Sequence, residues 1–388
     1  GTEDTLFQGT FDGGGHQITN LKIGKREYGG LFGNVWGATI QNCNVTGEVN
    51  GYNYSGGIVG YANDNTHILN CSFQGNVEGN GQDRGGIVGS TSMGNILTKQ
   101  FYRQRKDFED SCAGRDAGLT FPEGVRCSTD IAYADDGIKA HMLDIYRLED
   151  SQEKILPIII NVHGGGLIIG NKEFNRYFCA LLCKKGFLVY SIEYRLIPDC
   201  LIYDQIADVF MAMDYIKERL AADGGDSSHV YMAGDSGGAC LITYANAIQN
   251  STNIARAANV TPSGLRINAL GLISGMFYTS RFDKIGLFLP KYLYGRDYKK
   301  TPFAKYVNPE NRELLNSLAP VWLVTSHNDF LRRYTTDFEK ALTRAEREHE
   351  LVVFPKNKKL THAFSVFEPF MPESGAVIDM MVEYLRKF

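Results

Sequence analysis

Apolar positions in the first ninety residues form short runs that are interrupted by glycine and asparagine and return at a regular interval. Gly-Gly-Leu-Phe-Gly at 29–33 returns as Gly-Gly-Ile-Val-Gly at 56–60 and again at 85–89. Ile-Gln-Asn-Cys at 40–43 has its counterpart in Ile-Leu-Asn-Cys at 68–71, 28 residues later. This period and composition predict a β-solenoid over about 1–92. Its Ile and Val side chains would point inward, and Gly and Asn would form the corners, where positive φ angles are needed.

A different pattern begins near residue 155, where short β-rich runs alternate with longer helical stretches. The predicted strands lie at 158–162, 187–192, 229–232, 269–273, 321–325 and 351–354. The predicted helices lie near 172–185, 203–222, 237–249, 334–347 and 374–387. Strands that alternate with helices of this length indicate βαβ units. We therefore expect an α/β domain with a mostly parallel sheet covered on both faces.

Two stretches do not fit this alternation. Residues 95–120 are polar and helix-prone, and residues 276–317 are rich in aromatic side chains and contain three prolines. Open α/β folds bind ligands at the carboxyl edge of the sheet, and we expect both stretches to form a helical cap over that edge. The alternative, that they are ordinary packing helices, stays open.

The composition divides the chain near Met93. Residues 1–92 contain 21 of the 42 glycines and none of the 11 prolines, which predicts two domains, 1–92 and 93–388. The repeat array ends after its third Gly-Gly motif without an evident cap, although a solenoid needs its last edge protected. We expect that the second domain caps it, that it is a fragment of a longer array, or that two polypeptides have been joined artificially.

Charge and cysteine usage exclude several classes of protein. Lys and Arg number 40 against 44 Asp and Glu, a net charge of −4 without a basic tract, so we expect no nucleic-acid partner. We find no apolar run long enough to span a membrane, and the first residues do not resemble a signal peptide. The eight cysteines are scattered, which predicts neither a disulfide scaffold nor a zinc module. We expect no metal or cofactor.

A serine between glycines follows one of the predicted strands. Gly-Asp-Ser-Gly-Gly at 234–238 comes directly after the strand at 229–232 and before a helical run. That context is the one a nucleophile elbow requires, because the turn is strained and the strand and helix pack closely around it. Ser236 would then lie at a helix N-terminus, which favours developing negative charge. By itself the motif also occurs often by chance.

A glycine-rich turn precedes this serine by about seventy residues. His-Gly-Gly-Gly at 163–166 follows an apolar strand, and consecutive glycines can turn their N–H groups into a cleft, as an oxyanion hole requires. Such turns are common after strands, so the motif is weak alone. The two motifs together, each after its own strand and in this order, favour an acyl-transfer enzyme with a serine nucleophile.

The acid and the base of a serine triad should follow in the chain order Ser, Asp, His. Asp329 comes just after the strand at 321–325, and His362 comes after the strand at 351–354, so both would lie at the carboxyl edge of the sheet. Other candidates lie on a helix, on a lid loop or at charged surface positions and suit these roles less well: Asp283, Asp337, His327 and His349.

The repeats resemble the GLUG repeats of bacterial surface proteins, and residues 11–21 resemble the usual segment that leads into them. This resemblance covers about 1–92 and implies a repeat fold without chemistry of its own. It leaves open that the segment binds polysaccharide. We expect the thiols of Cys43 and Cys71 to pack on adjacent coils rather than form a disulfide.

Residues 93–388 resemble the hormone-sensitive-lipase-like family of α/β-hydrolases, in particular its bacterial carboxylesterases. The resemblance rests on the motifs at 163–166 and 234–238, on Glu-Tyr-Arg-Leu-Ile-Pro at 193–198, and on the segments at 329–331 and 362–364. It implies an α/β-hydrolase fold with a helical cap. It also implies a site in which Ser236 is the nucleophile, His362 the base and Asp329 the orienting acid, with oxyanion donors from the backbone N–H groups of Gly165, Gly166 and Gly237.

Two departures from the family pattern affect the surroundings of the site. Leu167 stands where a large aromatic residue often follows the glycines, and Arg333 stands where a second acid often follows the catalytic Asp. Neither position takes part in the expected chemistry. They leave open the shape of the substrate pocket and the hydrogen bonding of the acid loop.

The expected function is a serine carboxylesterase that hydrolyses short-chain acyl esters through an acyl-enzyme. One alternative is an amidase or arylformamidase on the same scaffold. Another is a surface protein that trims acetyl or feruloyl esters of polysaccharide. A catalytically weak hydrolase fold that serves as a binding module is disfavoured by the intact triad. The substrate is expected to be a small ester, and a homodimer is left open. The hydrolase alone favours the cytoplasm, whereas native repeats favour the cell surface.

Overall fold

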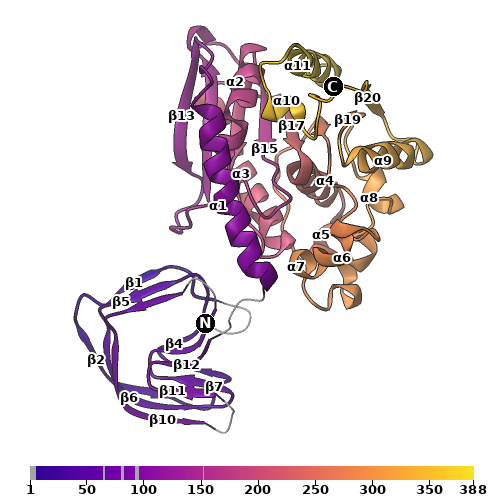
Figure 1. Cartoon of the computed structure of the whole chain (residues 1–388). Helices are drawn as coiled ribbons and strands as arrows, with labels where there is room; N and C mark the ends of the chain where they lie inside the picture. The colour runs from indigo at the N-terminus through magenta and orange to yellow at the C-terminus, as the bar shows by residue number, and fades with distance from the viewer. Residues whose placement is uncertain (1–5, 64–65, 80–82, 92–95, 152) are drawn as a thin grey trace. The chain divides into compact units, whose positions relative to one another are not determined.

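The computed structural model of the chain describes residues 6–63, 66–79, 83–91, 96–151 and 153–388. The chain forms two compact units, Gly1–Tyr102 and Arg103–Phe388 (Figure 1). The domain boundary expected between residues 92 and 93 lies outside the described residues. The division between the compact units falls within helix α1 (Ile96–Asp116).

The first unit consists of strands that pair in parallel across successive coils (Figure 1). In the described residues of this unit, the coils build four three-stranded sheets. Their strands are, in order, β1 (Thr10–Asp12), β5 (Thr39–Gln41) and β9 (His67–Leu69); β10 (Ser72–Gly79), β6 (Asn44–Gly51) and β2 (Gln17–Ile23); β11 (Asp83–Gly85), β7 (Tyr54–Gly56) and β3 (Tyr28–Gly29); and β12 (Val88–Thr91), β8 (Val59–Ala62) and β4 (Phe32–Val35). This arrangement is the predicted solenoid.

The sequence period sets the register of these sheets. Val45 of β6 pairs with Phe73 of β10, and Ile40 of β5 pairs with Ile68 of β9, each 28 residues apart. Buried Ile40 and Val45 belong to one apolar core that runs through the coils. Cys43 is buried in the same core and Cys71 lies half-buried, and both thiols are free.

The second unit is built on an eight-stranded sheet. Its order is β13 (Val125–Ala132), β14 (Met142–Leu148), β16 (Leu188–Ile192), β15 (Leu156–Val162), β17 (Gly225–Asp235), β18 (Ala269–Ile273), β19 (Val321–Ser326) and β20 (His349–Phe354). Strand β14 is antiparallel to both of its neighbours, and the remaining pairs are parallel. The six parallel strands are those that the sequence pattern predicts. Strands β13 and β14 were not predicted.

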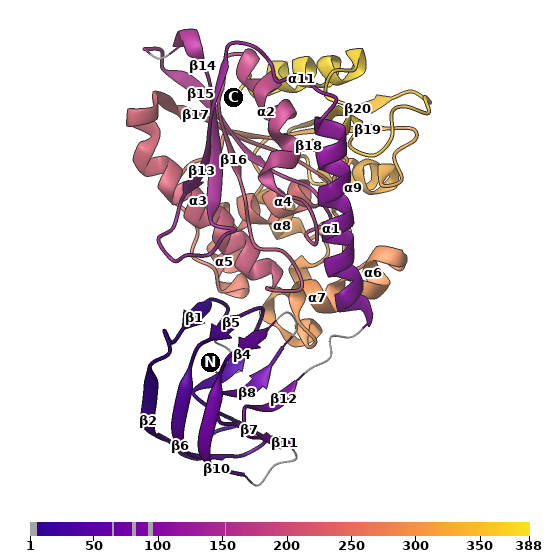
Figure 2. The same cartoon turned by 60° about the vertical axis from the view of Figure 1, so that its left-hand side comes forward.

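Helices cover both faces of this sheet (Figure 2). On one face, Ile158 and Ile160 of β15 pack in the same apolar cluster as helices α3 (Ile202–Asp223), α4 (Ser236–Asn250) and α9 (Arg332–Arg344). On the other face, Ile159 packs with helices α2 (Arg176–Lys184) and α11 (Pro372–Leu385). These three isoleucines are fully buried, as expected for a strand that is covered on both faces and is therefore mostly apolar.

The segments expected to form a cap are helical for most of their length. Helix α1 lies in the first segment. The second contains α6 (Lys284–Phe288), α7 (Pro290–Tyr294), two short 3-10 helices (Tyr298–Lys300 and Pro302–Tyr306) and α8 (Arg312–Asn316). Another short helix, α5 (Thr252–Ala258), follows α4.

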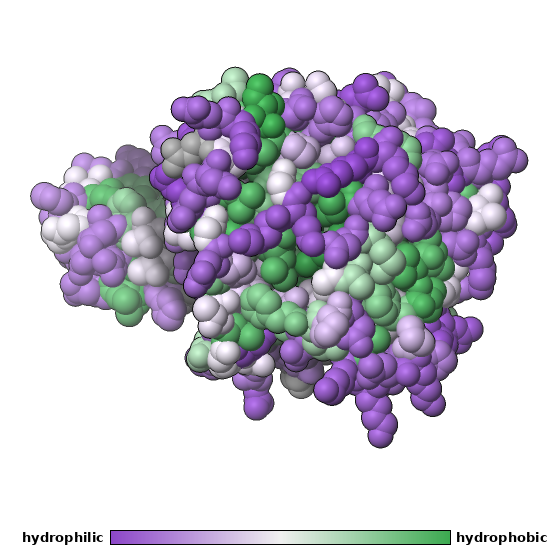
Figure 3. Space-filling view, turned by 90° about the horizontal axis from the view of Figure 1, so that it is seen from above, coloured by the Kyte–Doolittle hydropathy of each residue, from purple (hydrophilic) through white to green (hydrophobic). Residues whose placement is uncertain are grey.

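The guanidinium of Arg105 attaches α1 to the body of the second unit, because it donates to the carbonyls of Ile168 (2.7 Å) and Ile197 (2.6 Å) and pairs with Asp199 (2.6 Å). On the face that Figure 3 presents, hydrophobic side chains gather in several areas between hydrophilic ones. Such scattered apolar exposure is ordinary for a folded protein.

Candidate active site

Ser236 lies at the sharp turn where strand β17 ends and helix α4 begins. Its φ of 49° is in the left-handed region, which costs energy for a residue with a side chain. The chain can approach closely here because glycines flank the turn: a Cβ atom on Gly238 would lie 2.2 Å from the carbonyl oxygen of Val162. The residues around Ser236 thus form the tight strand-turn-helix that its motif predicts.

Ser236, His362 and Asp329 lie in hydrogen-bond contact, although they are far apart in the chain. His362 Nε2 lies 2.9 Å from Ser236 Oγ, and His362 Nδ1 lies 2.7 Å from Asp329 Oδ1. Because the carboxylate can only accept, Nδ1 carries a proton and Nε2 is left to accept the proton of the serine hydroxyl. The geometry is that of a nucleophile, a base and an orienting acid.

Asp329 is buried and held by several donors. Its carboxylate accepts hydrogen bonds from Thr325 Oγ1 (2.8 Å) and from the backbone N–H of Leu331 (2.8 Å), besides the one from His362. Burial by itself would raise the pKa of Asp329, but the hydrogen bonds that its carboxylate accepts, above all the one from His362, outweigh it and lower this pKa below its usual value. Asp329 therefore stays ionised and fixes the orientation of the imidazole.

The glycine loop after β15 lies against the first turn of α4. A Cβ atom on Gly237 would lie 2.9 Å from the backbone nitrogen of Gly166, so these two backbones nearly touch beside Ser236. Gly165 and Gly166 both have positive φ, 108° and 62°. The N–H of Gly237 is in the first helical turn, where it has no intrahelical acceptor. The structure thus brings Gly166 and Gly237, two of the expected oxyanion donors, next to each other, and Gly165 precedes them in the same loop.

Sequence reasoning missed Asp235, a buried carboxylate that holds this loop. Its Oδ1 accepts from the N–H of Gly164 (3.0 Å) and from Asn175 Nδ2 (3.0 Å). Burial raises the pKa of Asp235, and the hydrogen bond of Asn175 opposes this rise. The available signal was an acidic residue inside an otherwise small and apolar motif, where a charge needs partners.

His163, at the start of the glycine loop, is also buried and held by acceptors. Its Nδ1 faces the carbonyl of Gly164 (2.8 Å) and its Nε2 faces Glu193 Oε1 (3.2 Å). Both partners can only accept, so both ring nitrogens donate. Burial alone would lower the pKa of His163, but the charge of Glu193 raises it overall. The ring also stacks on Tyr194 at 4.3 Å, and the hydroxyl of Tyr194 donates to the carbonyl of His163 (2.8 Å).

The rival residues lie in other surroundings. Asp337 pairs with Arg281 (3.0 Å), and Asp283 caps helix α6 and accepts from Tyr334. His327 contacts Arg332, and His349 contacts Thr343. Of the two departures from the family pattern, Leu167 is fully buried and Arg333 is exposed.

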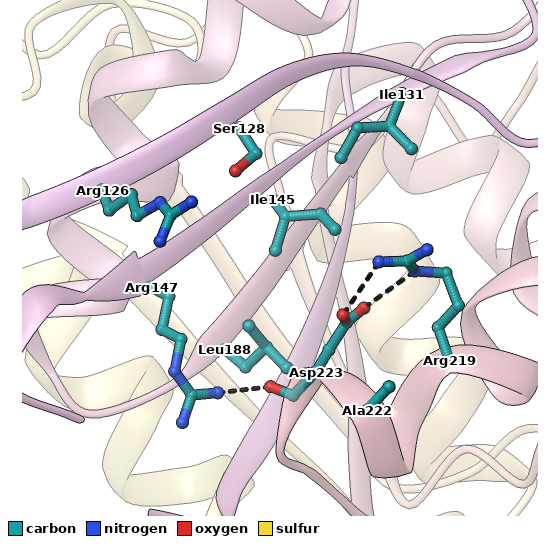
Figure 4. A pocket seen from close by; sticks show the side chains of 9 residues that line it. All are labelled: Arg126, Ser128, Ile131, Ile145, Arg147, Leu188, Arg219, Ala222 and Asp223. Atoms are coloured by element: carbon teal, nitrogen blue, oxygen red, sulfur yellow. Dashed lines mark hydrogen bonds and ion pairs between the residues drawn. The ribbon is translucent and has the colours of Figure 1, made fainter. Parts of the chain in front are cut away.

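A separate pocket of about 310 Å³ lies at strands β13 and β14 and the end of helix α3 (Figure 4). Two of the arginines that line this pocket bind the last residue of helix α3. Arg147 donates to the carbonyl of Asp223, and Arg219 pairs with the carboxylate of Asp223 (3.1 Å). Its lining includes none of Ser236, Asp329 and His362, and consists of Arg126, Ser128, Ile131, Ile145, Arg147, Leu188, Arg219, Ala222 and Asp223.

The described residues contain neither a cluster of metal ligands nor a helix that could span a membrane. Across the described residues, no group of three or more His, Cys, Asp or Glu side chains is placed to hold a metal ion. Within the same ranges, no helix combines the length and the apolar character that crossing a membrane requires.

Comparison with known proteins gives the family. The sequence model of the alpha/beta hydrolase fold family matches residues 159–365, more than half of the chain, and the GLUG motif matches residues 51–78. Both matches confirm the resemblances drawn from the sequence.

Among curated relatives, the probable isoprenylcysteine alpha-carbonyl methylesterase of Oryza sativa is 28% identical over 184 residues, which are 45% of this chain and 44% of that protein. The tuliposide A-converting enzyme b1 of Tulipa gesneriana is 29% identical over 124 residues, 29% of this chain and 33% of that protein. The chain thus spans less than half the length of these relatives.

Solved structures share the fold of the second unit. Esterase B from Lactobacillus Rhamnosis superposes with a TM-score of 0.70 at 22% identity, over 75% of this chain and 94% of that one. A bacterial heroin esterase gives a TM-score of 0.56 at 23% identity, over 74% and 92% of the two chains. Together with the family match and the parallel sheet, these likenesses establish the fold, and the chain belongs to the alpha/beta hydrolase fold family.

Proposed function

We propose that the chain is a carboxylic ester hydrolase in which Ser236, His362 and Asp329 act as a catalytic triad. The observation that carries this proposal is the continuous hydrogen-bond chain from Ser236 Oγ through the imidazole to Asp329. The names of the matched relatives and of the similar structures, methylesterases and esterases, favour the same reaction.

In the first half of the reaction, Ser236 Oγ attacks the carbonyl carbon of the ester while His362 Nε2 accepts the serine proton. Asp329 stabilises the imidazolium that forms. The electron pair of the carbonyl moves to its oxygen and returns when the bond to the alcohol breaks. His362 then gives its proton to the departing alkoxide, which leaves an acyl-enzyme on Ser236.

The negative oxygen of the tetrahedral intermediate needs donors that are already in place. The backbone N–H groups of Gly165, Gly166 and Gly237 serve this role in the proposal. In the second half of the reaction, His362 accepts a proton from water as the water oxygen attacks the acyl carbon. The carboxylic acid is released, and the proton returns to Ser236.

The proposed substrates are esters of short acyl chains, as the family resemblance implies. The names of the plant relatives add methyl esters to the classes that should be tested. An amidase on the same scaffold would use the same triad. The rate of hydrolysis of an anilide relative to that of an ester with the same acyl group therefore distinguishes an amidase from an esterase.

The test measures initial rates of the full chain on p-nitrophenyl esters from acetate to dodecanoate, on a methyl ester and on p-nitroacetanilide. We expect the short esters to be hydrolysed fastest, and Ser236→Ala to lower kcat by about 10⁵-fold or more. Ser227→Ala is the matched control, because Ser227 lies on the same strand at an exposed position. Undiminished turnover in Ser236→Ala would overturn the proposed nucleophile, and an anilide rate above the ester rate would favour the amidase.

A further inference from the structure

The second cap segment exposes large apolar side chains at its first helices. Phe282 is 91% exposed, Leu287 55% and Phe288 54%. Three large apolar side chains exposed within seven residues are unusual for a surface that stays in water, because each could bury its apolar area elsewhere. Phe282, Leu287 and Phe288 together form the apolar ridge.

Two residues of the ridge, Leu287 and Phe288, lie on an amphipathic stretch of helix, and Phe282 precedes its first turn. Leu289, between α6 and α7, has helical angles (φ −78°, ψ −36°), so the backbone stays helical from α6 into α7. Lys284, Leu287, Phe288 and Lys291 are exposed and follow the spacing i, i+3, i+4 and i+7, which places them on one face. The opposite face is anchored in the domain through buried side chains such as Leu293. Two lysines therefore flank the two exposed apolar side chains.

The segment that carries this ridge is rich in positive charge. Residues 281–305 contain seven basic and two acidic residues, although the whole chain has a net charge of −4. Three of the seven pair with carboxylates: Arg281 with Asp337, Lys300 with Asp297 and Lys305 with Glu313. The other four are exposed and, within the described part of the chain, pair with no carboxylate: Lys284, Lys291, Arg296 and Lys299.

The ridge is connected to the candidate active site. Asp283, between Phe282 and Lys284, accepts a hydrogen bond of 2.6 Å from the hydroxyl of Tyr334 in the first turn of α9. One turn before Tyr334, Phe330 is 74% exposed, and its ring lies 4.4 Å from the ring of His362. Exposed apolar side chains thus lie both on the cap and beside the proposed base.

We propose that the apolar ridge, together with the four cations that have no carboxylate partner, docks the protein on the surface of an anionic lipid bilayer. Apolar side chains of an amphipathic helix enter the boundary between headgroups and acyl chains, while flanking lysines reach back to the anionic headgroups. A second copy of the chain fits this surface less well, because a symmetric dimer would place the same cations opposite each other. Resting on the proposed esterase function, docking would give the site access to esters dissolved in the membrane.

The test is sedimentation of the full chain with vesicles of phosphatidylcholine, with and without phosphatidylserine. We expect about tenfold or stronger binding to the anionic vesicles, and a loss of that difference at high salt. The variant Phe282→Ser/Leu287→Ser/Phe288→Ser should lower binding about tenfold or more, and Lys284→Glu/Lys291→Glu should remove most of the dependence on phosphatidylserine. These side chains are exposed, so equal melting temperatures check that the variants fold.

Ile155→Ser is the matched control for the apolar substitutions. Ile155 is 75% exposed but precedes β15, at the opposite edge of the sheet from Ser236, and its loss should leave vesicle binding unchanged. Ser236→Ala should bind vesicles like the unmodified chain, so that a failure of the esterase proposal does not count as a failure of docking. The proposal would be overturned if vesicle binding did not depend on phosphatidylserine, or if the triple substitution left binding unchanged. A dimer, seen by light scattering, that the triple substitution dissociates would also overturn it.

Discussion

The two units of this chain differ in how far apart along the sequence their contacting residues lie. In the solenoid, residues that touch are separated by one repeat: Asn70 donates to Asn42 28 positions earlier, and Ser72 donates to Asn44 over the same separation. In the hydrolase unit, Ser236 and His362 are 126 positions apart. The Asn70–Asn42 bond has a counterpart one coil earlier, where Asn42 donates to Asp12 (3.0 Å), whereas each contact of the triad occurs once.

This difference decides what a single substitution can do. A solenoid behaves approximately as a sum of repeat stabilities and neighbour contacts, so the loss of one contact should weaken it locally. The triad instead depends on strands β17, β19 and β20, whose carboxyl ends meet at one edge of the sheet. Removing one member should abolish most of the chemistry while the fold remains.

After the loss of the nucleophile itself, the largest expected effect comes from the acid of the triad. Asp329→Asn keeps the size of the side chain but removes the charge that fixes the tautomer of His362, so kcat should fall by about 10⁴-fold. Initial rates on p-nitrophenyl acetate measure this loss. Asp337→Asn is the control, since Asp337 lies on α9 and pairs with Arg281. Equal losses in the two variants would contradict the assignment of the acid.

A smaller loss is expected when the loop that holds the oxyanion donors is pushed out of place. In Gly164→Ala the new Cβ would lie 2.1 Å from Asp235 Oδ2, so the loop has to shift, and kcat should fall about 100-fold. Gly375→Ala serves as a control, because its Cβ meets nothing within 4 Å in helix α11. We expect that variant to keep its rate and to melt at the same or a slightly higher temperature. If Gly164→Ala kept the kcat of the unmodified chain, catalysis would not depend on the position of the glycine loop.

Much of the fold followed from the sequence, because parallel strands covered on both faces need continuous apolar runs. Strands β13 and β14 lacked this signal. Arg126 and Asp130 of β13 are exposed at the edge of the sheet, and its partner β14 runs antiparallel. Neither strand has the continuous apolar run that a fully covered strand shows, so the pattern did not mark them.

The same reasoning explains which parts of the candidate site could be predicted from the sequence and which could not. The motifs mark Ser236 and the glycine loop directly, because their local geometry demands glycine. The partners of Asp235 could not be predicted, since Gly164 and Asn175 lie 71 and 60 positions away and meet it only through packing. The link between His163 and Glu193 was likewise missed, because it depends on which strand neighbours β15.

A substitution in the solenoid is expected to have an effect of intermediate size. It tests whether destabilising one coil affects the solenoid alone. In Gly47→Ala the new Cβ would lie 2.1 Å from the carbonyl oxygen of Leu21 in the neighbouring coil, which should destabilise the repeats by about 1–3 kcal/mol. Hydrogen exchange of the solenoid amides should rise, whereas ester hydrolysis should stay unchanged. Gly24→Ala, with nothing within 4 Å of its Cβ, should change neither. A parallel loss of hydrolysis in Gly47→Ala would show that the two units are not independent.

The smallest effect concerns the ion pair beneath the glycine loop, and its sign depends on pH. Glu193 raises the pKa of His163 above the usual 6.5. The pair therefore stabilises the fold fully below pH 6.5, and this contribution is lost as the pH rises through the raised pKa. Glu193→Gln should lower the melting temperature by about 3 °C in mildly acidic buffer, with a smaller loss in alkaline buffer. Glu218→Gln, at an exposed position of α3, should leave it unchanged throughout. If the decrease in melting temperature caused by Glu193→Gln stays constant or grows towards alkaline pH, His163 is neutral in the folded protein.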